Sequence, residues 1–130
     1  MTANLEPGLT GHSEWIVTSA MTATQVGSGT VAVFATPMLV ALMESAAIDA
    51  LKGHLPPGQT SVGTRIDVQH TAATPVRAAV RATAVLKAVE GRRLIFSIEA
   101  WDSIEKIGEA THERFLVDQA RFEAQAAGKQ

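Results

Sequence analysis

The clearest hydrophobic pattern in the chain is a mostly apolar segment over residues 36–53 that is bounded like a helix. It opens at Thr36-Pro37, where threonine is a good N-cap and proline suits the first helical position. It closes at Lys52-Gly53, where glycine supplies a left-handed stop. Apolar residues occupy nearly all faces of this helix, so it must be wrapped on most sides. We therefore predict one long buried helix.

Beyond residue 59 the apolar pattern changes to period two, which is typical of strands. In the first of these, over residues 60–70, the positions predicted to share the inner face are Val62, Thr64, Ile66, Val68 and His70. Further strands are predicted within residues 9–18 and over residues 76–87, 94–101 and 107–117. A strand, a buried helix and then an antiparallel meander make an α+β fold.

The polar, glycine-bearing residues 24–30 predict a loop that could lie over a pocket. The chain is expected to form a single domain over residues 1–130, with frayed ends at 1–8 and 123–130. The polar, alanine-rich stretch from Asp118 is alternatively a short helix.

The composition excludes several classes of function. The net charge is −2 and the arginines are scattered along the sequence, so no basic patch for binding nucleic acid is expected. The absence of cysteine excludes disulfides and thiolate chemistry, and no metal site is expected. No apolar run approaches a membrane-spanning length, and the N-terminus lacks the regions of a secretion signal. We expect a cytoplasmic protein that contacts neither membranes nor nucleic acid.

Glu44 is the one acid near the middle of the predicted helix, where an ionised carboxylate is costly to bury unless it is paired. His70, which points with the apolar set, is the best candidate partner, and Thr36 adds a hydroxyl. This combination suggests an active site. We expect His54 and His112 at the surface.

Six sequence blocks occur in an order and at spacings that resemble one known family. They are Phe34-Ala35-Thr36, Leu42-Met43-Glu44, Gly63-Thr64, His70-Thr71-Ala72-Ala73-Thr74-Pro75, Val89-Glu90-Gly91-Arg92-Arg93-Leu94, and Gly108 with Thr111-His112-Glu113-Arg114. Together they resemble the fluoroacetyl-coenzyme A thioesterase family of hotdog enzymes over about residues 33–122. No single block is decisive, but the ordered set is specific.

The resemblance implies a hotdog fold, with about five antiparallel strands around one central helix, and a homodimer whose site could lie at the interface. It implies hydrolysis of a short-chain acyl-CoA, with no cofactor because CoA is part of the substrate. The implied catalytic residues are Thr36, Glu44 and His70, and the implied substrate-binding residues are Gly63, Arg114 and Phe34.

Geometry constrains this assignment, because eight helical steps between Thr36 and Glu44 amount to about 12 Å. Either an imidazole bridges the remaining distance or the site is shared across a dimer. Gly63 and His70 have opposite parity on one strand, so we expect a main-chain contact at Gly63 or a bulge that changes the phase.

Other interpretations remain open at this stage. Thr36 either attacks the thioester to give an acyl-enzyme or positions a water activated by Glu44 and His70, unless it simply caps the helix. Residues 24–33 contain no aromatic side chain, unlike the lid of the fluoroacetyl-selective enzyme, so its acyl selectivity is not carried over. Hotdog folds also host hydratases and dehydratases, and a non-catalytic protein that binds acyl-CoA or a small ligand is a further alternative.

Overall fold

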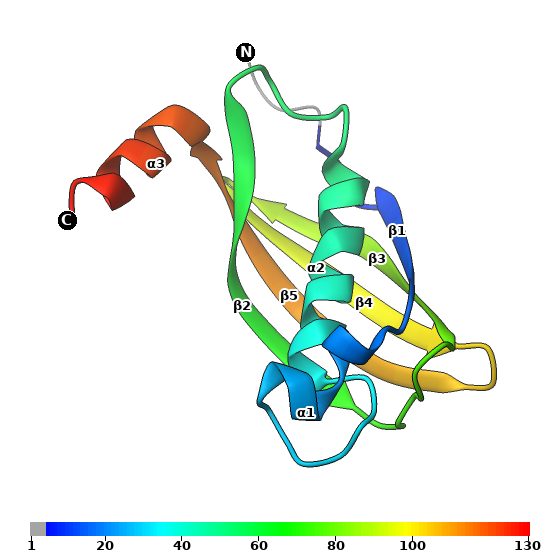
Figure 1. The fold of residues 1–130 in the computed structure, drawn as a ribbon. Helices are drawn as coiled ribbons and strands as arrows, with labels where there is room; N and C mark the ends of the chain where they lie inside the picture. Colours follow the sequence, from blue (N-terminus) through cyan, green and yellow to red (C-terminus); the bar gives the residue numbers. More distant parts are fainter. Residues whose placement is uncertain (1–4) are drawn as a thin grey trace.

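One antiparallel sheet of five strands curls around a single long helix, as predicted (Figure 1). The coordinates are a computed structural model, and the structure describes residues 5–130. The strands are β1 (Thr10–Ile16), β2 (Gln59–His70), β3 (Ala79–Glu90), β4 (Arg93–Asp102) and β5 (Lys106–Asp118). Their order in the sheet is β1-β3-β4-β5-β2. The central helix is α2 (Thr36–Leu51).

The ends of α2 agree with the sequence prediction at one side and differ at the other. Gly53 has a φ of +81°, as a left-handed stop requires. At the start, however, the N-cap is Ala35 and Thr36 is already the first helical residue. The prediction that Thr36 caps the helix is therefore wrong, because its hydroxyl lies inside the helical segment and is free to bond elsewhere.

The hydrophobic core lies between α2 and the concave face of the sheet. The completely or almost completely buried side chains include Leu39, Leu42, Met43, Leu86, Leu94, Phe96 and Ile98. Alternate residues of β3 and β4 point into this core, which confirms the period-two prediction there. Gly11 of β1 lies so close to α2 that a Cβ atom would meet Ala46 and Ala50 of the helix backbone.

A bulge in β2 changes which residues face the helix. The register with β5 shifts between Gly63 and Arg65, so Thr64 is the extra residue. After the bulge, Ile66 and His70 are partly buried, as predicted, while before it Ser61 and Gly63 lie on the inner side. The prediction that Val62 and Thr64 share the face of His70 is wrong, and the alternative of a bulge is confirmed.

Two other boundaries differ from the prediction. Strand β3 begins at Ala79 rather than at residue 76, because a turn precedes it in which Arg77 has a φ of +82°. At the C-terminus, α3 (Gln119–Ala127) is a helix whose N-cap Asp118 accepts a bond from the Arg121 amide, so the short-helix alternative is confirmed. The expectation of fraying is wrong for 123–127, and part of segment 1–8 lies outside the described residues.

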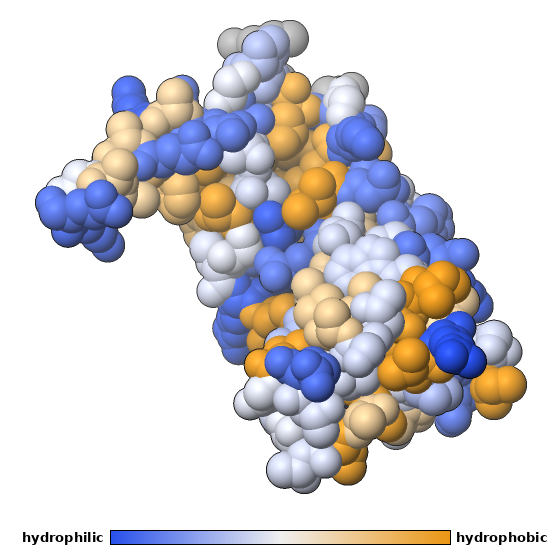
Figure 2. Space-filling model, viewed as in Figure 1, coloured by the Kyte–Doolittle hydropathy of each residue, from blue (hydrophilic) through white to orange (hydrophobic). Residues whose placement is uncertain are grey.

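The segment before α2 forms a compact flap at one end of the sheet (Figure 1). It contains η1 (Ser19–Met21) and α1 (Ala23–Val26), followed by a loop that returns to Phe34. Large apolar side chains are exposed here and elsewhere, and the apolar surface in Figure 2 is scattered rather than gathered in one patch. In residues 5–130, no helix has the length and apolar character needed to cross a membrane.

Candidate active site

Thr36 and His70 meet where the first turn of α2 approaches the end of β2. The Thr36 Oγ1 and His70 Nδ1 atoms are 2.8 Å apart, within hydrogen-bond distance. A hydroxyl this close to an imidazole can transfer its proton to the ring as it attacks an electrophile. The predicted proximity of these two residues is therefore confirmed.

His70 is suited to accept a proton because it is held in the neutral form. Burial lowers its pKa below the ordinary value of 6.5, while the backbone of Ala72 acts in the opposite direction. At neutral pH the ring therefore has a free lone pair. Its Nε2 atom is buried and has no hydrogen-bond partner among the described residues.

A cavity of about 350 Å³ opens directly onto this pair. Thr36 and His70 line it together with Phe34, and the loop before α2 contributes Val31 and Val33. Ser28 and Gly29 of the predicted loop also line the cavity, so its place over a pocket is confirmed, but residues 24–26 belong to helix α1 and the loop prediction is wrong there. Phe34 is only 1% exposed, so it forms an apolar wall of the cavity and also belongs to the core.

Glu44 pairs with Arg114 and not with His70. Its Oε2 atom lies 3.1 Å from Arg114 Nη1 and 3.8 Å from His112 Nε2. The side chain is 36% exposed, so the prediction of a buried acid paired with His70 is wrong within one chain. The physical reason is that β5 brings a buried arginine beneath the carboxylate, and an arginine is the stronger partner.

Arg114 is held from several directions. Its Nε donates to Ser61 Oγ at 2.8 Å, and its Nη2 donates to the Ser61 carbonyl at 3.1 Å. Its Nη1 contacts both Glu44 and His112 Nε2, each at 3.1 Å. Arg114 is only 4% exposed, so this network fixes a buried cation beside a partly exposed carboxylate.

Gly63 borders the same group. A Cβ atom at this position would collide with the Glu44 carboxylate and lie 3.3 Å from both Arg114 Nη1 and His112 Cε1. The absence of a side chain therefore makes room for the Glu44–Arg114 pair. The expected main-chain contact at Gly63 stays a prediction.

Sequence reasoning missed His112 and Ser61. His112 was expected at the surface but is 1% exposed. The alternation on β5 places it on the same face as buried Ala110 and Leu116, and this signal could have identified it. Alternation counted back from His70 places Ser61 on the outer face of β2. The bulge at Thr64 shifts this alternation by one residue, so Ser61 lies on the inner face instead.

The structure thus contains two polar groups on one helix. Thr36 with His70 lies at the N-terminal end of α2, and Glu44 with Arg114 lies about 12 Å further along the helix axis, as the helical rise requires. Either group could act alone, or a second copy of the chain could bring them together.

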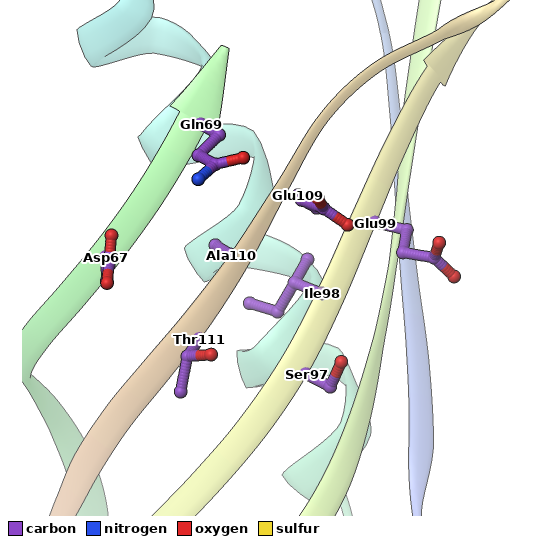
Figure 3. A pocket seen from close by; sticks show the side chains of 8 residues that line it. All are labelled: Asp67, Gln69, Ser97, Ile98, Glu99, Glu109, Ala110 and Thr111. Carbon is purple, nitrogen blue, oxygen red and sulfur yellow. The ribbon is translucent and has the colours of Figure 1, made fainter. Parts of the chain in front are cut away.

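A separate groove of about 430 Å³ lies on the opposite, convex face of the sheet (Figure 3). The side chains of Asp67, Glu99 and Glu109 line it, and Lys106 bridges the two glutamates at 2.7 and 2.9 Å. Although it is larger than the Thr36 cavity, its hydroxyl residues, Ser97 and Thr111, make no hydrogen bond to a basic side chain among the described residues, unlike Thr36. Its carboxylates would also repel an anionic substrate, so we assign the chemistry to the Thr36 cavity.

Comparison with known proteins identifies the family of this chain. A sequence profile of the fluoroacetyl-CoA-specific thioesterase family (FlK) matches residues 17–120. A fluoroacetyl-CoA thioesterase of Streptantibioticus cattleyicolor is 46% identical over 97 residues, which cover 75% of this chain and 70% of that protein. The chain belongs to this family. The family predicted from the six sequence blocks is thereby confirmed.

Solved structures extend the family relationship to the fold. A fluoroacetyl-CoA thioesterase superposes with a TM-score of 0.91 at 36% identity, covering 97% of this chain and 98% of the other. A thioesterase superfamily member from Thermus thermophilus superposes with a TM-score of 0.87 at 26% identity, covering 98% of this chain and 93% of its own. A hot-dog-like protein from Thermanaerovibrio acidaminovorans shares the fold, with a TM-score of 0.85 at 24% identity. The predicted hotdog fold is confirmed.

Proposed function

We propose that this protein hydrolyses a short-chain acyl-CoA thioester to the free acid and CoA. The observation that carries the proposal is the 2.8 Å contact between Thr36 Oγ1 and His70 Nδ1, at the mouth of a cavity in a thioesterase-family chain. A hydroxyl next to a neutral imidazole is what acyl transfer requires. Membership of the family favours hydrolysis over the hydratase and binding-protein alternatives.

In the first step, Thr36 Oγ attacks the thioester carbonyl while His70 Nδ1 accepts the hydroxyl proton. The tetrahedral intermediate then breaks the carbon–sulfur bond, and the imidazolium returns the proton to the departing CoA thiolate. Water attacks the acyl-enzyme with His70 again as base, and this releases the acid and restores the Thr36 hydroxyl. In the competing route, Thr36 instead holds a water that His70 deprotonates.

We assign Glu44, Gly63 and Arg114 to the same reaction through a homodimer. Within one chain Glu44 lies beside Arg114, about two helical turns from Thr36, so it cannot orient His70 of its own subunit directly. In a two-fold dimer, Glu44 and Arg114 of the partner subunit would complete the cavity. Arg114 would then provide the positive charge that stabilises the carbonyl oxyanion, and the backbone at Gly63 would face the acyl end.

The walls of the cavity favour a broad preference for short acyl groups. Val31, Val33 and Phe34 supply apolar surface. The loop over residues 24–33 contributes no aromatic ring that could seal off a fluoromethyl group. We therefore propose acetyl-CoA and propionyl-CoA as substrates alongside fluoroacetyl-CoA. Water is the only co-reactant in this scheme, so no cofactor is proposed, and the cytoplasm is the proposed site of action.

The test is thiol release from acetyl-, fluoroacetyl-, propionyl-, crotonyl- and phenylacetyl-CoA. Wild type is compared with His70→Ala and Thr36→Val, and with His12→Ala as a control at an exposed histidine of β1. We expect turnover in wild type and the control, and a loss of about 10³-fold or more in the other two. No thiol release by folded wild type would overturn the proposal, and consumption of crotonyl-CoA without free thiol would identify a hydratase.

The shared site has its own test, which mixes two inactive variants. When His70→Ala and Glu44→Gln subunits are unfolded and refolded together, half of the dimers are mixed. If one site takes His70 from one subunit and Glu44 from the other, each mixed dimer has one site in which both residues are native. About one quarter of wild-type activity should return in that case. No recovery beyond the separate variants, in dimers confirmed to be mixed, would place the site within one subunit.

A further inference from the structure

We propose that His112 is a positioning residue that holds the Arg114 guanidinium in its working orientation, and that it does so only as the neutral ring with the proton on Nδ1. The inference rests on the proposed function, in which Arg114 stabilises the acyl oxyanion. It assigns a role to a buried residue that acts through another side chain.

Both ring nitrogens of His112 are engaged. Nδ1 lies 2.8 Å from the Arg65 carbonyl oxygen, and Nε2 lies 3.1 Å from Arg114 Nη1. A carbonyl only accepts and a guanidinium only donates, so Nδ1 must carry the proton and Nε2 must offer its lone pair. The two partners therefore select one neutral tautomer.

The bulge in β2 places the acceptor that fixes this tautomer. Arg65 is the first residue after the register shift at Thr64, and its carbonyl oxygen accepts from the imidazole. On the other side, the Phe96 ring of β4 lies 6.2 Å from the imidazole centroid. With 1% exposure, the His112 ring has no freedom to turn without losing both bonds.

His112 completes the restraint on Arg114. The guanidinium has five N–H donors, and it donates four hydrogen bonds: two to Ser61, one to Glu44 and one to His112. The Ser61 bonds fix the Nε and Nη2 side, while His112 is the buried partner of Nη1. Glu44 is partly exposed and can move, so without His112 the orientation of Nη1 would follow the carboxylate.

Protonation of His112 would reverse its effect on Arg114. The charged groups that act on the ring are Arg114 and Glu44, which face it, and Glu113, which lies on the other face of β5. Burial is the main reason that the pKa of His112 lies below 6.5, with the neighbouring guanidinium acting in the same direction and the two carboxylates against it. An imidazolium has no lone pair for Arg114 and would turn its Nε2–H toward Glu44, so acid should release the arginine.

Two variants at this position separate positioning from packing. His112→Gln keeps a hydrogen-bond acceptor near the place of Nε2 but cannot titrate, whereas His112→Leu fills the space without an acceptor. We expect kcat/KM to fall about ten- to a hundredfold in His112→Leu, mainly through kcat, and within about threefold in His112→Gln. The matched control is His12→Gln on the exposed side of β1.

The pH profile provides the readout that a structural role would not change. Below pH 6.5, kcat/KM of wild type should fall with two protonations, one at His70 and one at His112. In His112→Gln it should fall with one, while His12→Gln should retain both. The proposal would be overturned by an equal loss of kcat/KM in His112→Gln and His112→Leu, or by full activity in His112→Leu. It would also be overturned if the pH profile of His112→Gln matched that of wild type.

The tautomer can be measured without any variant. Nitrogen-15 spectra of the histidine rings at neutral pH should show His112 with a protonated Nδ1 and an unprotonated Nε2. The opposite tautomer, or a charged ring, would overturn the proposal even if thioester hydrolysis is observed. Absence of thiol release from wild type would instead contradict the proposed function, so the two failures are distinguishable.

Discussion

At the scale of single residues, Gly63 shows how the site depends on missing atoms. We expect Gly63→Ala to lower kcat/KM by roughly ten- to a hundredfold, because the added methyl group would displace the Glu44 carboxylate from Arg114. The displaced group is the end of a flexible side chain, so the free energy of unfolding should change by less than about 1 kcal/mol. Kinetics and urea unfolding of the same preparation check both expectations.

The contrary result for Gly63 is a variant that unfolds easily or one that keeps full activity. The control is Gly128→Ala after α3, where a Cβ atom would meet Ala124 and Gln125 carbonyls at an ordinary 3.5 Å. This control should leave both activity and stability unchanged.

Several residues of the candidate site could be predicted from the sequence, but which of them contact one another could be predicted only in part. The contact between Thr36 and His70 agrees with the prediction because the helix start, the strand parity and the family resemblance all indicated these two residues. The partner of Glu44 was assigned wrongly, because sequence periodicity indicates which face a side chain takes and not which of several inward residues it meets. Arg114 reaches Glu44 across 70 positions of the chain, a distance that no local pattern records.

At the scale of elements, the contact between β1 and α2 requires a glycine. Gly11→Ala would place a methyl group 2.7 Å from the Ala50 Cα and against the helix backbone, which cannot move as a side chain can. We expect the free energy of unfolding to fall by about 2 kcal/mol or more, with a lower Tm. Calorimetry on Gly11→Ala and Gly128→Ala, side by side, measures the difference.

The same contact provides an independent check on that prediction. The amide of His12 donates to Asp49 at 2.9 Å and the Ser13 hydroxyl donates to the Leu42 carbonyl at 2.6 Å, so the two residues that follow Gly11 tie β1 to α2. Faster hydrogen exchange at the His12 amide in Gly11→Ala would show that β1 has moved away. An unchanged Tm and unchanged exchange would contradict the close approach.

Most elements were predictable from the sequence because their signals are local. Alternation identifies β3 and β4, and Gly53 marks the end of α2. The errors occur where one residue changes the phase or the start of an element. Thr64 forms a bulge in β2, and Arg77 takes a left-handed conformation before β3. Neither threonine nor arginine is a residue type that indicates such a conformation in the sequence.

At the scale of the whole molecule, the two partly or fully buried histidines of the site connect its function with its stability. His70 and His112 both have pKa values lowered by burial, so the folded protein resists protonation that the unfolded chain accepts. Above pH 6.5 both states are unprotonated at these residues, and their contribution to stability is complete. Below pH 6.5 the unfolded chain takes up protons first, and stability is lost as the pH falls toward the folded-state values.

Each histidine that remains unprotonated only in the folded state lowers the free energy of unfolding by about 1.4 kcal/mol per pH unit. The slope between pH 6.5 and 5.5 should therefore be steeper in wild type than in His112→Gln, which lacks one of the two groups. Urea unfolding at fixed protein concentration measures this, since concentration must be constant if the chain dimerises. Equal slopes would mean that His112 protonates alike in both states, which its buried bonds to Arg65 and Arg114 forbid.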